Sequence, residues 1–538
     1  MRIGIYNRWL HTLGGGERHM GAVAGYLAQQ HQVDIITHQP MPVAEMESRL
    51  GLNLGSTRII SVPLDVDYSN VSALTRSYDL FINASHLDLY PSFAKTSVQL
   101  VYFPAELPSV SRAAEGQMVA TAKEMKKRLA YWLLEESAEI GLLSGFGKPD
   151  RAAGVHFRPA SATAALLVPY QGKGDLNLRL KLRVPQEREA GRSTLSFRVG
   201  GQALPFQLTP TPGVFERHDL TIPSEWLPRR PGKVLLEVLS SVLPEAESGR
   251  LGGNPRVGVE IAWVKLAQPR WREIGSDLLL RGDLWYIQNW HRPPAHPLAS
   301  YARIWANSEY TRRWVARYWD RAASVLYPPC DPICQSRPAA KRNLILSVGR
   351  FFAGSHSKKH IPMIRAFKSM CDAGFSGWEY HLVGGYYESD ATQAEYVAAV
   401  EREAQGYPVH VRRNLPADDL KVLFGESKIF WHATGLDENE EDHPERFEHF
   451  GITTVEAMSA WCVPVVIGKA GQLEIVRHGV DGFLWKTVEE LKAYTAQLAA
   501  DDSLREKLAE KARARSQDFA MPAFERTLCG LVSEMNLG

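Results

Sequence analysis

Two stretches of this chain repeat a pattern in which a short apolar run is followed by a turn and a segment with apolar residues on one face. The runs suit buried parallel strands, and the one-sided segments suit helices that cover them. The apolar runs of the first stretch are residues 2–7, 32–37, 58–62, 78–84 and 97–103. Those of the second are residues 344–349, 381–385, 409–411, 429–435 and 465–467. The pattern predicts two Rossmann-like α/β domains.

A different pattern interrupts the first stretch. Within residues 141–269, apolar and polar positions alternate, as at Leu176, Leu178, Leu180 and Leu182, and Gly, Pro or charged residues separate the segments. Alternation predicts half-buried strands, and many short strands with frequent turns are typical of a β-sandwich. We therefore expect a β-sandwich inserted into the first Rossmann-like unit, with a structural or acceptor-positioning role.

The α/β fold class thus comes with a predicted division of the chain. We assign residues 1–140 with 270–335 to the first Rossmann-like domain, 141–269 to the inserted sandwich, 336–520 to the second Rossmann-like domain and 521–538 to a C-terminal helix. Residues 327–331, Tyr-Pro-Pro-Cys-Asp, break regular structure as a linker between domains would.

Composition and charge argue against some classes of function but do not identify one. The chain has 538 residues, a formal net charge of +2 and five cysteines. The small charge gives no reason to expect a nucleic-acid partner, and the cysteines lack the paired spacing of a zinc site. The first residues have the pattern of a strand and not of a signal peptide, and no apolar run approaches the roughly 18 residues of a membrane span. We expect a cytoplasmic protein with reduced thiols.

Residues 113–137 are predicted to form an amphipathic helix, with Lys123, Lys126, Lys127 and Arg128 beside apolar residues. A basic helix of this kind can lie on an anionic membrane, and an ordinary surface helix has the same pattern. Peripheral contact with the inner face of the membrane is therefore one of two open interpretations.

A glycine-rich turn, Gly14, Gly15 and Gly16, follows the first strand and precedes a helical pattern. A dinucleotide site would need Gly-x-Gly-x-x-Gly directly after the strand and an acid at the end of the second strand. Several residues separate the strand from the glycines here, and His38 follows the second strand. The turn therefore argues against an NAD site. A tight turn that needs glycine for a positive φ is the alternative to a functional loop.

The second domain contains two carboxylates, Glu448 and Glu456, with seven residues between them. We expect a helix that Thr453 caps, with Glu456 completing a capping box, and that ends at Val463-Pro464. Because the helix follows a glycine, its unpaired N–H groups would offer a seat for a phosphate.

Basic residues frame the predicted strand-to-helix loop at the start of this domain. Arg350 ends the first strand, and Lys358 and Lys359 precede the next helix. A guanidinium and an ammonium here could neutralise a diphosphate, with Arg as a fork and Lys as a point charge. Two solvated bases are the alternative for the lysines.

The second domain resembles the retaining glycosyltransferases of family 4, whose GT-B fold has two Rossmann-like domains facing across a cleft. The resemblance rests on Glu-His-Phe-Gly-Ile-Thr-Thr-Val-Glu-Ala-Met at residues 448–458, on the Pro-led apolar strand that follows, and on Gly-Val-Asp-Gly-Phe-Leu at 479–484. It extends more weakly to residues 1–110 and 300–331 and does not include the insert. In that fold the first domain is the acceptor side, and the last helix crosses back onto it.

The resemblance implies a role for each candidate site residue. Glu456 would bind the ribose hydroxyls and Glu448 the donor sugar, while Arg350 and Lys358 would stabilise the departing diphosphate. Further positions are implied in three groups: donor contacts at Phe450, Gly451, Ile452, Thr453 and Lys359, a loop facing the cleft at Gly14, Gly15 and Gly16, and a cleft histidine at His86.

The implied activity is transfer of a hexose, with retention and without a metal, from a GDP- or UDP-linked sugar to a glycan or lipid-linked acceptor. No separate cofactor is implied. Two alternatives stay open, a nucleotide-sugar epimerase or hydrolase with the same fold and a non-catalytic glycan-binding protein. Turnover without an acceptor would indicate the first, and glycan binding without turnover would indicate the second.

Overall fold

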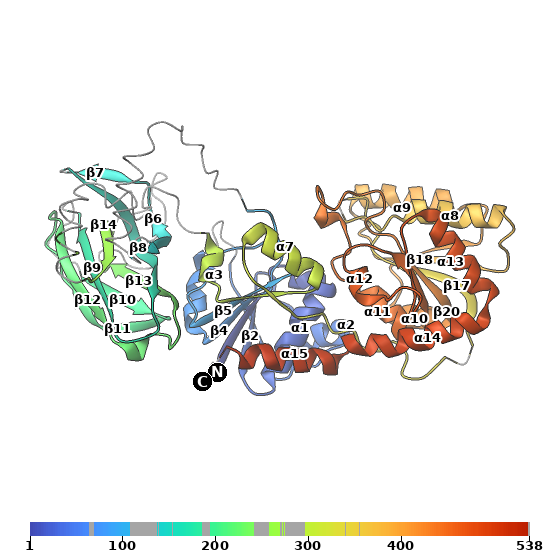
Figure 1. Cartoon of the computed structure of the whole chain (residues 1–538), viewed down its shortest axis with the longest axis horizontal. Coiled ribbons are helices and arrows are strands. Elements are labelled where there is room, and N and C mark those ends of the chain that lie inside the picture. The colour runs from blue at the N-terminus through green and yellow to red at the C-terminus, as the bar shows by residue number, and fades with distance from the viewer. Residues whose placement is uncertain are drawn as a thin grey trace.

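The computed structural model describes both predicted α/β stretches and most of the insert (Figure 1). The residues outside the description are 64–68, 108–136, 138, 153, 186–193, 241–257, 269–271, 273, 275–295, 339, 355 and 536–538. The basic helix predicted at 113–137 therefore lies outside the described residues, apart from Ser137. Every helix in the described part of the chain is too short or too polar to span a membrane.

The first domain is built on a seven-stranded parallel sheet with the order β16-β15-β5-β4-β1-β2-β3. Its strands are β1 (Arg2–Tyr6), β2 (Gln32–Thr37), β3 (Arg58–Ser61), β4 (Leu80–Asn83), β5 (Thr96–Val101), β15 (Arg303–Ala306) and β16 (Ser324–Val325). Its helices are α1 (Gly15–Ala28), α2 (Val43–Leu50), α3 (Ser69–Leu74) and α7 (Glu309–Trp319). The central strands are buried on both faces, which is why the sequence shows them as continuous apolar runs.

The insert enters this sheet between two neighbouring strands. β15 pairs in parallel with β5, from Arg303 opposite Val98 to Ala306 opposite Val101, although the whole insert separates them in the sequence. The described strands of the insert are β6 (Gly141–Phe146), β7 (Asp150–Ala152), β8 (Val155–Tyr170), β9 (Leu176–Arg183), β10 (Leu195–Val199), β11 (Gln202–Leu208), β12 (Glu216–Ile222), β13 (Gly232–Ser240) and β14 (Val259–Leu266).

All of these strands belong to one hydrogen-bonded assembly that is joined through the long strand β8. β13 pairs with the carboxyl half of β8 and β14 with its amino half, and every pairing is antiparallel. The assembly packs on the first domain at Phe93, which shares a hydrophobic cluster with Leu143 and Leu167. Beside it Arg76 Nε donates to Glu237 Oε1 at 2.7 Å. The two layers of a sandwich and the domain boundaries stay predictions.

The second domain is built on a six-stranded parallel sheet with the order β19-β18-β17-β20-β21-β22. Its strands are β17 (Arg342–Val348), β18 (Glu379–Gly384), β19 (Val409–Arg413), β20 (Ser427–His432), β21 (Val463–Ile467) and β22 (Phe483–Trp485). Its helices are α8 (His360–Asp372), α9 (Ala391–Ala404), α10 (Ala417–Glu426), α11 (Ile452–Ser459), α12 (Gln472–Ile475), α13 (Val488–Ala500) and α14 (Asp502–Ser516). The strand order reverses between β17 and β20, and ligands of open α/β sheets bind at the carboxyl ends of the strands at such a point.

The chain passes between the two domains twice, and the two passages lie side by side. The first follows β16 and the second follows α14. The backbone N–H of Cys330 donates to the carbonyl of Phe519 at 2.8 Å, and the rings of Tyr327 and Phe519 lie 5.3 Å apart.

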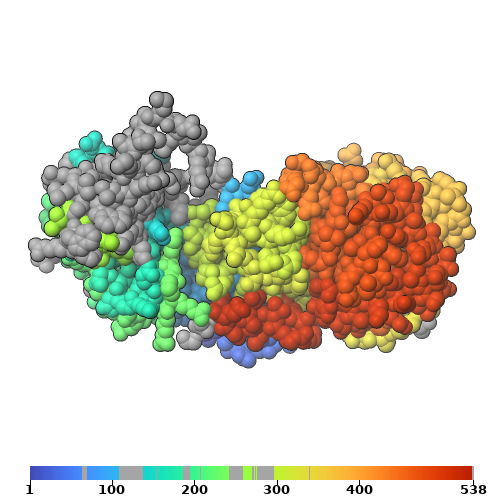
Figure 2. All heavy atoms as spheres, viewed as in Figure 1, coloured from blue at the N-terminus to red at the C-terminus, as the bar shows by residue number. Residues whose placement is uncertain are grey.

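After the second passage, α15 (Met521–Ser533) returns to the first domain. Its buried side chains Phe524 and Leu528 belong to the hydrophobic core of the first sheet. The helix is drawn in red along the middle part of the molecule in both views (Figures 1 and 2).

The helix of the two-carboxylate motif begins differently from the prediction. α11 starts directly after Gly451, and no side chain caps it, so the capping box of Thr453 and Glu456 is wrong. Gly451 adopts a φ of 119°, and a Cβ there would lie 2.5 Å from Gln472 Nε2. Glycine is therefore required at this turn. Because Glu456 takes no part in a capping box, its carboxylate can bind a different group.

The same helix also ends earlier than expected. Its last residue is Ser459, and Pro464 lies inside β21. Trp461 adopts a φ of 58° two residues after the helix, and a left-handed residue just past the C-terminus is a common helix stop. The backbone turns out of the helix before the proline is reached.

The packing of α15 on the first domain predicts a large effect of shortening one buried side chain. We expect Leu528→Ala to lower the free energy of unfolding by about 2–5 kcal/mol, because it leaves a cavity in the core. Arg526→Ala, which removes an exposed side chain of the same helix, should change it by less than about 0.5 kcal/mol. Denaturant unfolding followed by fluorescence measures both variants, and equal midpoints would contradict this packing.

Candidate active site

Glu448 lies at the carboxyl ends of the second sheet, where three elements bring charged groups together. Its Oε2 accepts from Lys358 Nζ at 2.6 Å and lies 2.9 Å from His432 Nε2. Lys358 comes from the loop before α8, and His432 is the last residue of β20. The structure therefore joins two residues of the predicted site, Glu448 and Lys358, in one ion pair.

The electrostatics of this group keep the carboxylate ionised. Burial alone would raise the pKa of Glu448, but the charge of Lys358 and the hydrogen bond from His432 hold it well below its ordinary value. Burial lowers the pKa of His432. Sequence reasoning missed His432, although its place at the carboxyl end of a parallel strand was a usable signal.

Glu456, the second carboxylate, pairs with a residue of the other domain. Arg18, in the first turns of α1, places Nη1 3.2 Å from Glu456 Oε1 and Nη2 3.2 Å from Asp331 Oδ2. Burial raises the pKa of Glu456, and the charge of Arg18 opposes that shift. Arg18 was not predicted, because nothing in the sequence indicates a partner 438 residues away.

The glycine-rich turn lies against the start of α11. A Cβ at Gly15 would be 2.8 Å from Ile452 Cδ1, so glycine allows the two domains to approach closely here. Gly14 precedes α1, and Gly16 packs under the ring of Tyr102, whose hydroxyl donates to the Gly16 carbonyl at 2.6 Å. None of the three glycines has a positive φ, so the tight-turn alternative is wrong.

The backbone at the start of α11 offers hydrogen-bond donors to this cleft. The N–H groups of Gly451, Ile452 and Thr453 have no acceptor within the described residues, as expected for the first turn of a helix. Phe450 is different, because its side chain is buried in the core beside Tyr327. Only the backbone of Phe450 can contribute to a site.

Arg350 and Lys359 are placed differently from each other. Arg350 is exposed near His356, and within the described residues it forms no ion pair. Lys359 precedes α8 and binds Glu438 at 2.7 Å, which turns it toward the acidic stretch 437–442 and away from Glu448. The structure thus leaves Arg350 available to a ligand and gives Lys359 a partner within the protein.

Stacked rings join the two domains beside Glu448. The His449 ring stacks on Phe103 of the first domain with centroids 4.3 Å apart, and on His356 of the second at 5.2 Å. Burial, aided by the charge of Lys358, lowers the pKa of His356 to about 4, and burial holds that of His449 well below its ordinary value. Both imidazoles are neutral near pH 7, and His449 Nε2 has no hydrogen-bond partner among the described residues.

His86 lies on the first domain at the wall of a cavity that Tyr102, Phe103 and Trp319 also line. It is close enough to His449 for its charge to act on that imidazole. The structure therefore places the predicted cleft histidine on the side of the first domain that faces the stacked rings.

Comparison with known proteins shows what the second domain is similar to. Residues 334–515 match the family model of glycosyl transferases group 1. Two curated relatives are similar to part of the chain. A GDP-Man:Man(3)GlcNAc(2)-PP-Dol alpha-1,2-mannosyltransferase of Dictyostelium discoideum is 25% identical over 41% of this chain and 45% of its own length. The alpha-1,3/1,6-mannosyltransferase ALG2 of Mus musculus is 24% identical over 39% and 53%.

The chain spans about half the length of the curated relatives it matches. Among solved structures, that of Anabaena Alr3699/HepE in complex with UDP and glucose aligns over 99% of this chain and 100% of its own, with 12% identity and a TM-score of 0.50. At that identity the likeness shows the fold alone. The predicted fold class, α/β with GT-B architecture, is confirmed, and residues 334–515 of this GT-B protein are similar to glycosyl transferases group 1.

Proposed function

We propose that this protein transfers a hexose from a nucleotide diphosphate sugar to a glycan or lipid-linked acceptor, with retention of configuration and without a metal. The observation that carries the proposal is the carboxylate of Glu448, only 14% exposed, which Lys358 and His432 hold at the carboxyl ends of the second sheet. The similarity of this domain to glycosyl transferases group 1 supports it.

Charge neutralisation is the central step in this proposal. As the anomeric bond breaks, negative charge develops on the leaving diphosphate. Lys358, Arg350 and the free N–H groups of Ile452 and Thr453 at the start of α11 are the donors that would stabilise this charge. Glu448 uses Oε2 for its two partners, so its other oxygen would accept hydrogen bonds from the donor sugar.

Glu456 and Arg18 are proposed to act together on the ribose. Arg18 holds the carboxylate of Glu456 from the opposite domain, so a ribose hydroxyl bound there would meet an acid already fixed in place. Arg18 is therefore a positioning residue in this scheme. Its contact also links the donor site to the first domain, where His86 and the ring of Phe103 are proposed to contact the acceptor.

We propose GDP-mannose as the donor and a lipid-linked glycan as the acceptor, because the name of the Dictyostelium discoideum relative specifies GDP-Man and a dolichol-linked glycan. A cytoplasmic location with peripheral contact at the inner face of the membrane is part of the same proposal.

Donor binding provides the first test. We expect one nucleotide sugar from a panel of GDP- and UDP-linked hexoses to raise the melting temperature of the full chain, because a ligand that binds the folded state stabilises it by mass action. Radiolabelled sugar should then pass to a lipid-linked or glycan acceptor in the absence of added metal. Release of free sugar without an acceptor would indicate the hydrolase alternative. No stabilisation by any donor would contradict the proposal.

The ion pair of Glu448 predicts a specific loss of turnover. Glu448→Gln and Lys358→Ala should each lower kcat roughly 10²–10³-fold, by analogy with the loss of one charge-stabilising donor. Glu445→Gln is the matched control, because Glu445 lies in the preceding turn and makes only partly exposed ion pairs. Its turnover should equal that of the parent. Parent-like turnover in Glu448→Gln would remove this residue from the mechanism.

The contact across the cleft predicts coupling between two residues. Arg18→Ala and Glu456→Gln should each weaken donor binding, and the double variant should be no weaker than the worse single variant, since both remove one interaction. Calorimetric titration with the donor measures the three affinities. Arg18→Lys keeps the charge and should restore part of the affinity. Strictly additive losses would show that the two residues act independently.

A further inference from the structure

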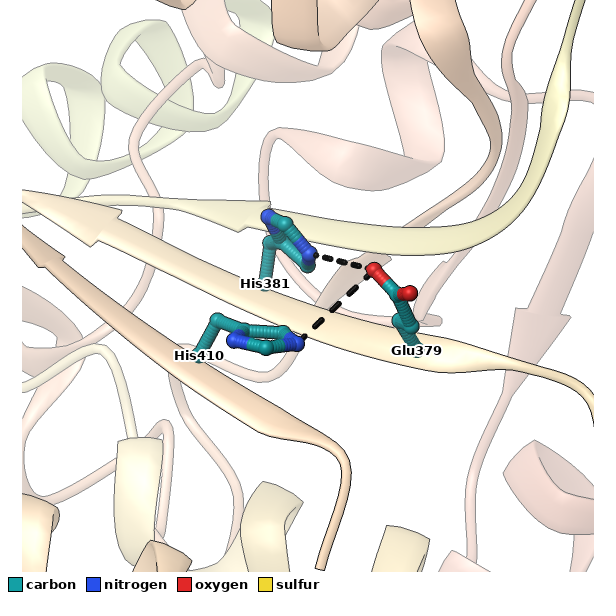
Figure 3. Close-up of side chains that lie close together, drawn as sticks. All are labelled: Glu379, His381 and His410. Atoms are coloured by element: carbon teal, nitrogen blue, oxygen red, sulfur yellow. Dashed lines mark hydrogen bonds and ion pairs between the residues drawn. The ribbon is translucent and has the colours of Figure 1, made fainter.

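A second group of polar side chains lies at the amino ends of the strands in the same domain, away from the cleft. Glu379 and His381 belong to β18, and His410 is the partner of His381 in the neighbouring strand β19. Side chains two residues apart in a strand share a face, and so do direct partners in a parallel pair. The register alone therefore places all three on one face of the sheet (Figure 3).

The ends of these side chains converge on one point. Glu379 Oε2 lies 3.1 Å from His381 Nε2 and 3.8 Å from His410 Nε2, and the two ring centroids are 4.5 Å apart. One ligand atom from each residue lies within 4.8 Å of the others. Zinc binds nitrogen and carboxylate oxygen at about 2.0–2.2 Å, so a small rotation of the half-exposed His410 would complete three ligands.

The chemistry of these groups favours a transition metal over a harder cation. Two imidazoles and a carboxylate suit zinc, nickel or copper, whereas magnesium and calcium prefer oxygen ligands alone. Three protein ligands also leave a fourth position for water. His381 is 2% exposed, and its Nδ1 has no hydrogen-bond partner among the described residues. In the metal-free protein the Nε2–H group of His381 can donate to Glu379, and a metal bound at Nε2 would take the place of that proton.

One neighbour competes with a metal. Arg342 Nη2 lies 3.0 Å from the same Glu379 oxygen, while its Nη1 binds Glu426 at 2.9 Å. A metal must displace the first of these contacts, and Arg342 can keep the second. Removing Arg342 should therefore raise the metal affinity, whereas removing one of the three ligands should lower it.

We propose that Glu379, His381 and His410 form a binding site for a divalent transition metal, with zinc as the expected ion. The proposed metal site has a structural role, because Glu379 is the first residue of β18. The candidate active site lies at the other end of that strand. Glu379 and Gly384 are five residue steps apart along the strand, or roughly 16 Å at the usual rise. A metal here would fasten β19, the edge strand of the sheet, to β18.

Titration of the metal-free full chain with zinc tests the proposal. After dialysis against a chelator, calorimetry should show one equivalent bound, and cobalt should give the absorption bands of a four-coordinate site. Removing a ligand by His410→Ala or Glu379→Gln should lower the zinc affinity at least about 10-fold, the smallest loss expected even for an outer partner. Both side chains are exposed enough to be changed without opening the core, and circular dichroism confirms the fold of each variant.

Two further variants separate this site from adventitious binding. Arg342→Ala should raise the zinc affinity, because it removes the competing cation. His443→Ala, which removes an exposed histidine outside the cluster, should leave the affinity unchanged. Zinc should raise the melting temperature of the parent but not of His410→Ala, and chelation should leave glycosyl transfer intact. Absence of stoichiometric binding, or binding that survives His410→Ala, would overturn the site, and loss of transfer on chelation would overturn its structural role.

Discussion

A carboxylate that is largely shielded from water needs a cation nearby. This requirement explains the two ion pairs on the facing surfaces of the two domains. Glu448 finds its cation, Lys358, within its own domain, whereas Glu456 finds Arg18 on the other. Isolated buried charges are costly, so the charge of Lys358 or Arg18 favours the ionised form of each acid by lowering its pKa. The first pair lies entirely within the second domain. The second pair exists only while the domains face each other, which makes the completeness of the site a property of both.

Neutral imidazoles complement this arrangement. His356, His432 and His449 lie around the same acid and lysine, and burial lowers the pKa of each of them. Three more positive charges near Lys358 and Arg350 would repel one another in a poorly solvated space. As uncharged rings, His449 can stack on Phe103 and His356 on His449, and their nitrogen atoms can bind hydroxyl groups.

The sequence was sufficient for the fold class because buried parallel strands leave continuous apolar runs, and the family resemblance singled out Glu448 and Lys358, which the structure places in contact. The sequence did not predict features that depend on packing or on contacts between residues far apart in the chain. Thr453 looked like a helix cap, but Gly451 could take a conformation that made a cap unnecessary. Arg18 could not be found, because its partner is set by how the domains meet. His381 and His410 become neighbours only through the register of two strands.

The two interdomain passages, joined by the hydrogen bond from Cys330 to Phe519, have a mechanical consequence. Because both covalent connections run side by side, we expect motion of one domain relative to the other to centre on this place. The two passages therefore act as one hinge between the domains. Since Asp331, a partner of Arg18, directly follows Cys330, rotation at this hinge would also move a partner of the residue that binds Glu456.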